Sequence, residues 1–170
     1  MRSTLTRSSP VVLTCLAAAV VALLLPSAAI GAVPWGPESP PFNVEVVLRP
    51  VTGGDGFGLV KFRQPNDADK IIYLDTWLRD LAPNHEYLLQ RAVDTTLDGT
   101  CPVTGWLTLG EGLTPRSIAT GDTGSGRAAL FRNVGMLAVG ARFDITFRAV
   151  DAVTGLPVLA SGCYRFTVSL

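Results

Sequence analysis

Short segments in which polar and apolar residues alternate constrain the fold of this chain most strongly. In residues 142–150, Phe143, Ile145 and Phe147 occupy every second position, with polar residues between them. A half-buried antiparallel strand has this period of two, because successive side chains point to opposite faces of the sheet. No segment keeps the 3.6-residue period of an amphipathic helix. The sequence therefore predicts an all-β fold.

About eight short strands are expected, and residues that favour turns separate them. Clusters of Gly, Pro and Asp, such as PVTGGDG at 50–56 and GDTGSG at 121–126, mark these turns. The strand-forming runs cover residues 42–48, 57–63, 71–81, 86–94, 106–109, 116–120, 127–134, 142–150 and 157–168. Such a pattern is typical of a β-sandwich or barrel, and we expect one Greek-key β-sandwich domain over residues 42–170.

One local motif indicates how two strands are connected. Leu81, Pro83 and Tyr87 stand in an L-x-P-x-x-x-Y arrangement. This is the form of a tyrosine corner, in which the tyrosine hydroxyl bonds back to the backbone of the turn between two Greek-key strands. We therefore expect a structural role for Tyr87 rather than a catalytic one.

The N-terminal segment is typical of an exported protein. Its first ten residues carry two arginines and no acid, residues 11–25 form an uncharged apolar run, and the small residues of PSAAIGA follow. This order predicts a secretory signal peptide over residues 1–32. A membrane anchor is the alternative, but Pro26 interrupts the run before it reaches the roughly 20 apolar residues that a spanning helix needs.

Removal of residues 1–32 would leave about 138 of the 170 residues, which is enough for one domain. The first of these, residues 33–41, contain four prolines and are expected to be a lead-in without regular structure. Without the two arginines of the signal, the 14 Lys and Arg residues fall to 12 against 14 Asp and Glu, a net charge of −2. This balance argues against a nucleic-acid partner and against a basic membrane-binding surface.

Two of the three cysteines would remain after cleavage, because Cys15 lies inside the signal. In an oxidising compartment the remaining pair, Cys101 and Cys163, is expected to form a disulfide. Two free thiols are the alternative. The bridge would fasten the glycine-flanked loop around Cys101 to the last strand.

Several stretches of the chain, taken in order, are similar to parts of one known family. Residues 58–62 (GLVKF), 78–87 and 118–128 look like its second strand, its third strand with the following turn, and its central hairpin. Cys101 and Cys163 are placed similarly to its intrasubunit disulfide. In these respects the chain resembles the copper/zinc superoxide dismutase-like β-sandwich family. The resemblance implies a superoxide dismutase-like Greek-key sandwich, itself related to immunoglobulin-like sandwiches.

The chain lacks the metal ligands that the resemblance would imply. The copper-binding H-x-H pair of the family corresponds to EYLLQR at residues 86–91, and its zinc loop corresponds to residues 95–111, which contain no histidine. The late copper histidine would fall near Phe147 or Arg148, and the whole chain has a single histidine, His85. Zinc and copper sites need several nitrogen or sulfur ligands. We therefore expect no metal, no cofactor and no dismutase activity on this fold.

Other catalytic constellations are also incomplete in the sequence. With one histidine and no free cysteine, the common nucleophile–base triads lack a member. Paired carboxylates for glycoside chemistry could come from five acids, but their spacing selects no pair; these acids are Asp75, Asp94, Asp98, Glu111 and Asp144. The acidic turns at 66–69 and 94–98 do not have the spacing of a calcium loop. No catalytic residue is assigned.

The strand expected at residues 71–81 offers a candidate binding face. If Ile72, Leu74 and Leu78 point toward the core, the residues between them share the opposite face, where large aromatic side chains would mark a contact surface. These residues are Tyr73, Asp75, Trp77 and Arg79. The alternatives are a central strand covered on both sides, or the inverse assignment of the two faces.

Three functional hypotheses follow. The first is a secreted, non-catalytic binding or envelope-associated module whose ligand is a protein or a glycan. The second is a secreted enzyme of unidentified class, and the third is a structural component of the envelope without a dedicated ligand. An exposed aromatic face would favour the first, and a uniformly polar surface would favour the third.

Overall fold

The structure, a computed structural model, describes residues 44–65 and 68–169, and all of these residues belong to one compact unit. The expected signal peptide (1–32), the proline-rich lead-in (33–41) and the start of the 42–48 strand lie outside the described residues. The described part has twelve strands and no helix, which confirms the all-β class. Accordingly, it includes no helix of the length and apolar character needed to span a membrane.

Six strands of seven or more residues form most of the sheet. They are β1 (Val44–Pro50), β2 (Phe57–Arg63), β3 (Ile71–Arg79), β4 (Glu86–Asp94), β9 (Gly126–Asn133) and β10 (Arg142–Asp151). The shorter strands are β5 (Leu107–Thr108), β6 (Gly110–Glu111), β7 (Thr114–Pro115), β8 (Ser117–Ala119), β11 (Pro157–Ala160) and β12 (Tyr164–Thr167).

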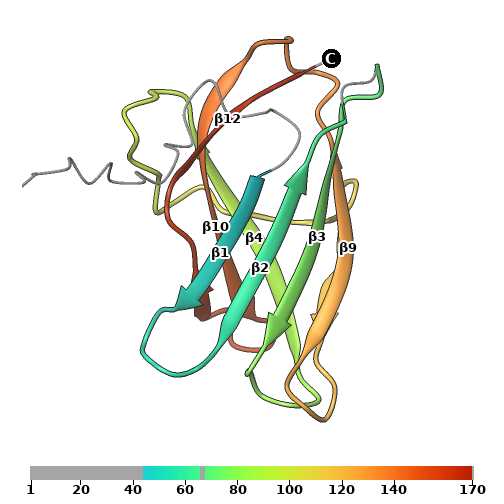
Figure 1. The fold of residues 1–170 in the computed structure, drawn as a ribbon, viewed down its shortest axis with the longest axis vertical. Helices are drawn as coiled ribbons and strands as arrows, with labels where there is room; N and C mark the ends of the chain where they lie inside the picture. Colours follow the sequence, from blue (N-terminus) through green and yellow to red (C-terminus); the bar gives the residue numbers. More distant parts are fainter. Residues whose placement is uncertain (1–43, 66–67, 170) are drawn as a thin grey trace, which may run out of the picture. The chain divides into compact units, whose positions relative to one another are not determined.

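The long strands lie in two layers (Figure 1). One layer has the order β1-β2-β3-β9, and β4 and β10 lie behind it together with β11 and β12. Because β11 pairs with both β10 and β1, hydrogen bonding passes from one layer into the other. On the opposite side, β5 pairs with β4 and the neighbouring β6 pairs with β9. The strands therefore form one sheet that nearly closes into a barrel.

The inner face of this sheet is apolar and aromatic. The ring of Phe62 on β2 lies 4.6 Å from that of Phe166 on β12 and 6.1 Å from that of Phe147 on β10, measured between centroids. Leu48 and Leu74 are also buried in this core. Burial of one such side chain stabilises the fold by roughly 1.5–3 kcal/mol, so the alternation seen in the sequence sets which face of each strand points inward.

The expected strands at 157–168 and 71–81 differ from the structure, and the hairpin of β6 and β7 was not expected. The expected strand at 157–168 is divided into β11 and β12. Between them the amide of Ser161 donates to the carbonyl of Phe147, but the amide of Phe147 donates to the hydroxyl of Ser161 and not to a backbone carbonyl, both at 2.9 Å. The expected strand at 71–81 ends at Arg79, because Asp80 has a φ of 56°, which extended backbone does not permit.

The turn between β3 and β4 contains the contact expected of a tyrosine corner. Tyr87 is buried on β4, and its hydroxyl accepts a hydrogen bond from the amide of Ala82 at 3.1 Å. Leu81 and Pro83 flank that amide in the turn. The hydroxyl thereby satisfies a backbone donor that neither strand can pair.

The disulfide between Cys101 and Cys163 is confirmed, with 5.4 Å between the two Cα atoms. A second contact fastens the same loop. The buried carboxylate of Asp144 accepts hydrogen bonds from the amide of Gly99 and from Nε of Arg165, both at 2.8 Å, and Nη2 of Arg165 also donates to the carbonyl of Leu97. The loop at 95–106 is therefore held to β10 and to the chain around β12.

Candidate functional site

The outer face of the β1-β2-β3-β9 layer carries the residues predicted as a binding face. Along β3 the inward residues are buried, whereas Tyr73 is 36% exposed, Arg79 is exposed, and Asp75 and Trp77 are half-buried. The expected orientation of the strand is therefore correct, and its inverse does not hold.

Strand register places further aromatic and basic residues beside these four. Trp77 stands opposite Arg127 of β9 on one side and opposite Leu59 of β2 on the other. In the same way Arg79 stands opposite Phe57 of β2. Residues directly opposite one another on a face are close enough for their side chains to touch. The candidate face thus extends over neighbouring strands.

Guanidinium groups lie over the aromatic rings of this face. The Cζ of Arg127 is 4.6 Å from the ring centroid of Trp77, and that of Arg79 is 4.5 Å from the centroid of Phe57. Two longer contacts, at 5.2 and 5.4 Å, join Arg49 to Phe57 and Arg63 to Tyr73. All four lie within the roughly 6 Å range of a cation–π interaction. The stacking holds flexible arginine side chains against the sheet.

The face carries more positive than negative charge, although the whole chain is balanced at 14 basic and 14 acidic residues. Its outward positions include five basic side chains and two carboxylates. These are Arg49, Lys61, Arg63, Arg79 and Arg127, against Glu45 and Asp75. Two of these cations have a carboxylate within 4 Å in the described structure: Arg127 lies 3.8 Å from Asp75, and Arg79 lies 3.6 Å from Asp80, which follows β3.

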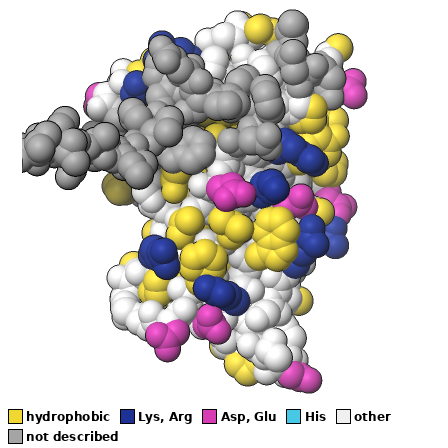
Figure 2. Space-filling model, viewed as in Figure 1, with side chains coloured by type: hydrophobic (Ala, Val, Ile, Leu, Met, Phe, Trp, Pro, Cys, Tyr) yellow, Lys and Arg dark blue, Asp and Glu magenta, His cyan; other side chains and the backbone are white. Residues whose placement is uncertain are grey.

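A shallow depression lies on this face between the aromatic and basic side chains. Phe57, Leu59, Trp77, Arg79 and Arg127 contribute to its lining. Figure 2 shows hydrophobic side chains grouped on the visible surface of the layer, with Lys and Arg side chains around them. A guanidinium stacked on a ring keeps its N–H edge free to donate to oxygen anions. The arrangement can bind an anionic ligand that also has apolar surface.

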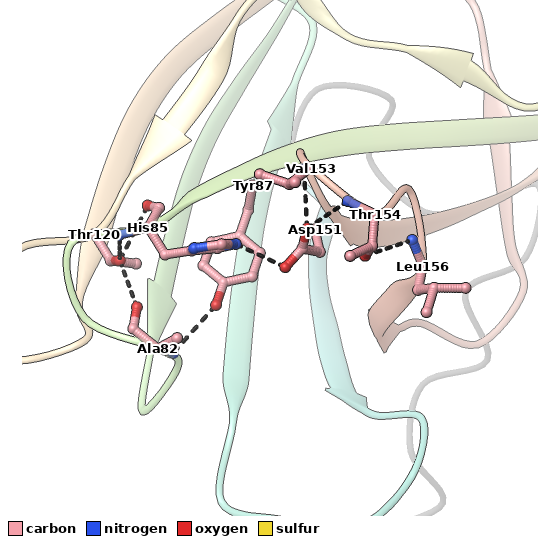
Figure 3. A network of polar contacts seen from close by, with 8 residues as sticks. All are labelled: Ala82, His85, Tyr87, Thr120, Asp151, Val153, Thr154 and Leu156. Atoms are coloured by element: carbon pink, nitrogen blue, oxygen red, sulfur yellow. Dashed lines mark hydrogen bonds and ion pairs between the residues drawn. The ribbon is translucent and has the colours of Figure 1, made fainter.

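His85 lies away from this face, in a network that joins two turns (Figure 3). Its Nε2 is 2.6 Å from Oδ2 of Asp151, and its ring packs edge-on against Tyr87 with 5.1 Å between centroids. The nearby hydroxyl of Thr120 is bonded to backbone groups of Ala82 and His85. The network fixes the β3–β4 turn against the β10–β11 turn, and the hydroxyl groups of Tyr87 and Thr120 in it bond to backbone groups.

A metal site is not apparent in the described part of the chain. Residues 44–65 and 68–169 contain no group of three or more His, Cys, Asp or Glu side chains that could hold an ion. The expectation that the protein needs no metal stays a prediction.

Sequence reasoning missed the residues that other strands bring to the site. Phe57 and Arg127 are 70 positions apart, and a period of two assigns a face within a strand but not the identity of its neighbour. It also missed Arg91 and Arg132, which point to the inner side of the sheet. For Arg91 a signal was present, since it shares its parity with the core residues Tyr87 and Leu89.

The chain was compared with known protein families, curated proteins and solved structures. Neither a protein-family model, nor a curated protein, nor a solved structure matches the chain.

Proposed function

We propose that this chain is a secreted, non-catalytic binding domain, and that the outer face of β1, β2, β3 and β9 holds an acidic glycan. The observation that carries the proposal is the set of guanidinium groups stacked on Phe57, Tyr73 and Trp77 across neighbouring strands.

The charge of the face favours an anionic ligand. Arginine donates two parallel hydrogen bonds to a carboxylate or sulfate, and such charge-assisted bonds are roughly twice as strong as neutral ones. Stacking on a ring restricts Arg79 and Arg127 before the ligand arrives. Less side-chain entropy is therefore lost on binding.

The shape of the face favours a glycan over a compact small molecule. The depression beside Trp77 is shallow and open, and the basic residues are distributed over β1, β2, β3 and β9. Neighbouring strands are spaced about 4.8 Å apart, so these cations can contact successive charged groups of an extended chain. The partly exposed rings and the apolar side chain of Leu59 offer surface for the C–H faces of sugars.

The finer fold and the location belong to the same proposal. We infer a Greek-key sandwich of the superoxide dismutase-like kind, which the pairing of the non-consecutive strands β3 with β9 and β4 with β10 supports. The disulfide fits a location outside the cytoplasm, and the signal peptide proposed at residues 1–32 would direct the chain there. A purely structural envelope component is less favoured, because the outer face is aromatic as well as polar.

Calorimetric titration of the mature domain with polygalacturonate at low salt tests the proposal. The Arg79→Gln, Arg127→Gln double variant should bind at least about tenfold more weakly, since a lost charged hydrogen bond costs about 1.5–3 kcal/mol. Neutral dextran should not bind, and added salt should weaken the binding of polygalacturonate.

Arg148→Gln is the matched control. Arg148 also stacks on an aromatic ring, 4.0 Å from the centroid of Trp106, but it lies on β10 in the other layer. Its substitution should leave the glycan affinity unchanged. An equal loss in this control, or wild-type binding to an acidic protein but to no acidic glycan, would reject the proposal.

A further inference from the structure

The inner side of the sheet contains a cavity separate from the outer face. Its volume is about 570 Å³, within the range of roughly 300–1,000 Å³ that is typical of small-molecule sites. The lining is largely apolar, and β2, β3, β4, β9 and β10 all contribute to it. Its walls include Phe62, Leu74, Leu109, Phe143, Ile145 and Phe147.

Two arginines interrupt this apolar lining. Arg91 of β4 stands opposite Phe147, and Arg132 of β9 stands opposite Ile72, so both occupy positions on the inner side of the sheet. No Asp or Glu is among the described residues that line the cavity.

The guanidinium of Arg91 has no hydrogen bond or ion pair with any residue that the structure describes. Arg132 uses one nitrogen, Nη1, to donate to the carbonyl of Gly112 at 3.1 Å. Burial, and then repulsion from Arg132, lower the pKa of Arg91 from its usual value. Two like charges at an apolar cavity are unfavourable without a counter-charge, so an anion is the group that would complement this site.

The apolar character continues to the surface beside the cavity. Met136 is 100% exposed, Leu113 is 81% exposed and Leu137 is 39% exposed, and all three line the cavity. Exposed apolar side chains gathered around a cavity are a feature of ligand-binding grooves. They provide an apolar path between solvent and the interior.

We propose that this cavity binds a single-chain anionic amphiphile, a long-chain carboxylate, with its headgroup between Arg91 and Arg132 and its alkyl chain against the aromatic and aliphatic lining. The headgroup supplies the missing negative charge, and the chain fills the apolar volume. This site does not involve the outer face, so a test of carboxylate binding can succeed or fail whatever the result for glycan binding.

Titration of the full mature domain with dodecanoate, below the concentration at which it forms micelles, tests the site. We expect saturable binding of one molecule per domain. Dodecanol, which has the same chain without the charge, should bind at least about tenfold more weakly, and dodecyltrimethylammonium should bind more weakly still. Equal affinity for all three would show a merely apolar cavity and overturn the proposal.

Arg91→Met is the decisive variant, because methionine keeps much of the side-chain volume and removes the charge. It should weaken dodecanoate binding at least about tenfold, leave dodecanol binding unchanged and not lower the melting temperature. Arg132→Met should weaken dodecanoate binding in the same direction. The control is Arg127→Met on the outer face, which should leave dodecanoate affinity unchanged. Unaltered dodecanoate affinity in Arg91→Met would refute the proposed headgroup site.

Co-sedimentation with phosphatidylglycerol vesicles separates a free carboxylate from a membrane surface as the source of the anion. Vesicle binding without binding of dissolved dodecanoate would also overturn the cavity site, because it would assign the exposed Leu113 and Met136 to a surface contact instead.

Discussion

Asp151 joins two turns that are far apart in the sequence. Its Oδ1 accepts hydrogen bonds from the amides of Thr154 at 2.8 Å and Val153 at 2.9 Å, and its Oδ2 contacts Nε2 of His85. These bonds, that from the Thr154 amide foremost, lower the pKa of Asp151 from 3.8 to about 2. The ionised form of the Asp151 side chain is therefore more stable in the folded protein than in the unfolded chain.

The sign of this shift predicts how stability depends on acid. A carboxyl whose pKa is lowered by folding stabilises the fold fully above its unfolded pKa of 3.8, and this contribution is lost as the pH falls to about 2. Asp151→Asn should lower the melting temperature near neutral pH and should flatten its decline between these two values. Thermal unfolding monitored by circular dichroism across that range measures both effects.

Asp55→Asn provides the control for this prediction. Asp55 is exposed in the β1–β2 turn and forms no ion pair among the described residues. Its substitution should leave the decline of the melting temperature at acid pH unchanged. If the melting temperature of Asp151→Asn declined at acid pH as steeply as that of the wild type, the His85–Asp151 network would not stabilise the fold.

The loop at 95–106 is the element that depends most on contacts outside the β ladders. The bridge from Cys101 to Cys163 spans 62 positions, and the bonds of Asp144 and Arg165 hold the chain at Leu97 and Gly99. The hydrogen bond from Arg165 lowers the pKa of Asp144, so the carboxylate stays charged in this buried position. The bridge and the polar contacts restrain the same loop at different points.

Removal of the bridge should cost stability and leave ligand binding intact. The Cys101→Ser, Cys163→Ser double variant should lose about 2–4 kcal/mol of unfolding free energy, because the unfolded chain is no longer restricted. Glycan affinity should not change, since neither cysteine lies on the outer face. Urea denaturation with and without reductant measures the effect: reductant should destabilise the wild type and not the variant. A wild type that is indifferent to reduction would contradict this role.

The sequence predicted the long strands well because their inner and outer residues alternate. β2 and β4 have the expected bounds, and the faces of β3 are as expected. The hairpin of β6 and β7 was not expected, since two-residue strands carry no periodicity. On β10 the polar residues Asp144 and Thr146 are buried as well as the apolar residues, although the alternation placed them on the outer face. The hydrogen bond from the Gly99 amide to Asp144 shows that the loop at 95–106 reaches this outer face of β10.

The candidate face was only partly accessible to sequence reasoning for a related reason. Tyr73 and Trp77 could be placed on one side of β3 from their parity alone. Their partners Arg63 and Arg127 lie on strands that become neighbours only after the sheet has formed. Long-range pairing is a property of the topology, which local patterns do not encode.

At the scale of the whole molecule, the two opposite sides of one sheet carry different sets of side chains. The outer side combines stacked guanidinium groups with aromatic rings, and the inner side combines Arg91 and Arg132 with a largely apolar lining. Because one sheet separates them, substitutions on one side should act independently of those on the other. The carboxylate experiment uses this separation, since its control, Arg127→Met, lies on the outer side.

The proposed export predicts a shortened protein outside the cell. Cleavage after the small residues that end the apolar run should give a mature N-terminus between Ile30 and Val33. Mass spectrometry of protein recovered from the culture medium measures that terminus. Recovery of the protein only from membranes, with Met1 still present, would favour the anchor instead.

The pairing of β1 with β11, which joins the two layers, has a consequence for the order of folding. β1 meets β11 only through the pairs of Arg49 with Ala160 and Pro50 with Leu159, and one further bond runs from the amide of Val51 to the carbonyl of Val158. The pairing of β1 with β11 therefore cannot form before residues 158–160 are available, and the disulfide cannot form before Cys163 is available. Contacts between such distant segments form slowly. Under the proposed export, a chain still emerging from the translocation pore cannot complete its barrel or its disulfide, so folding is deferred to the compartment in which the protein acts.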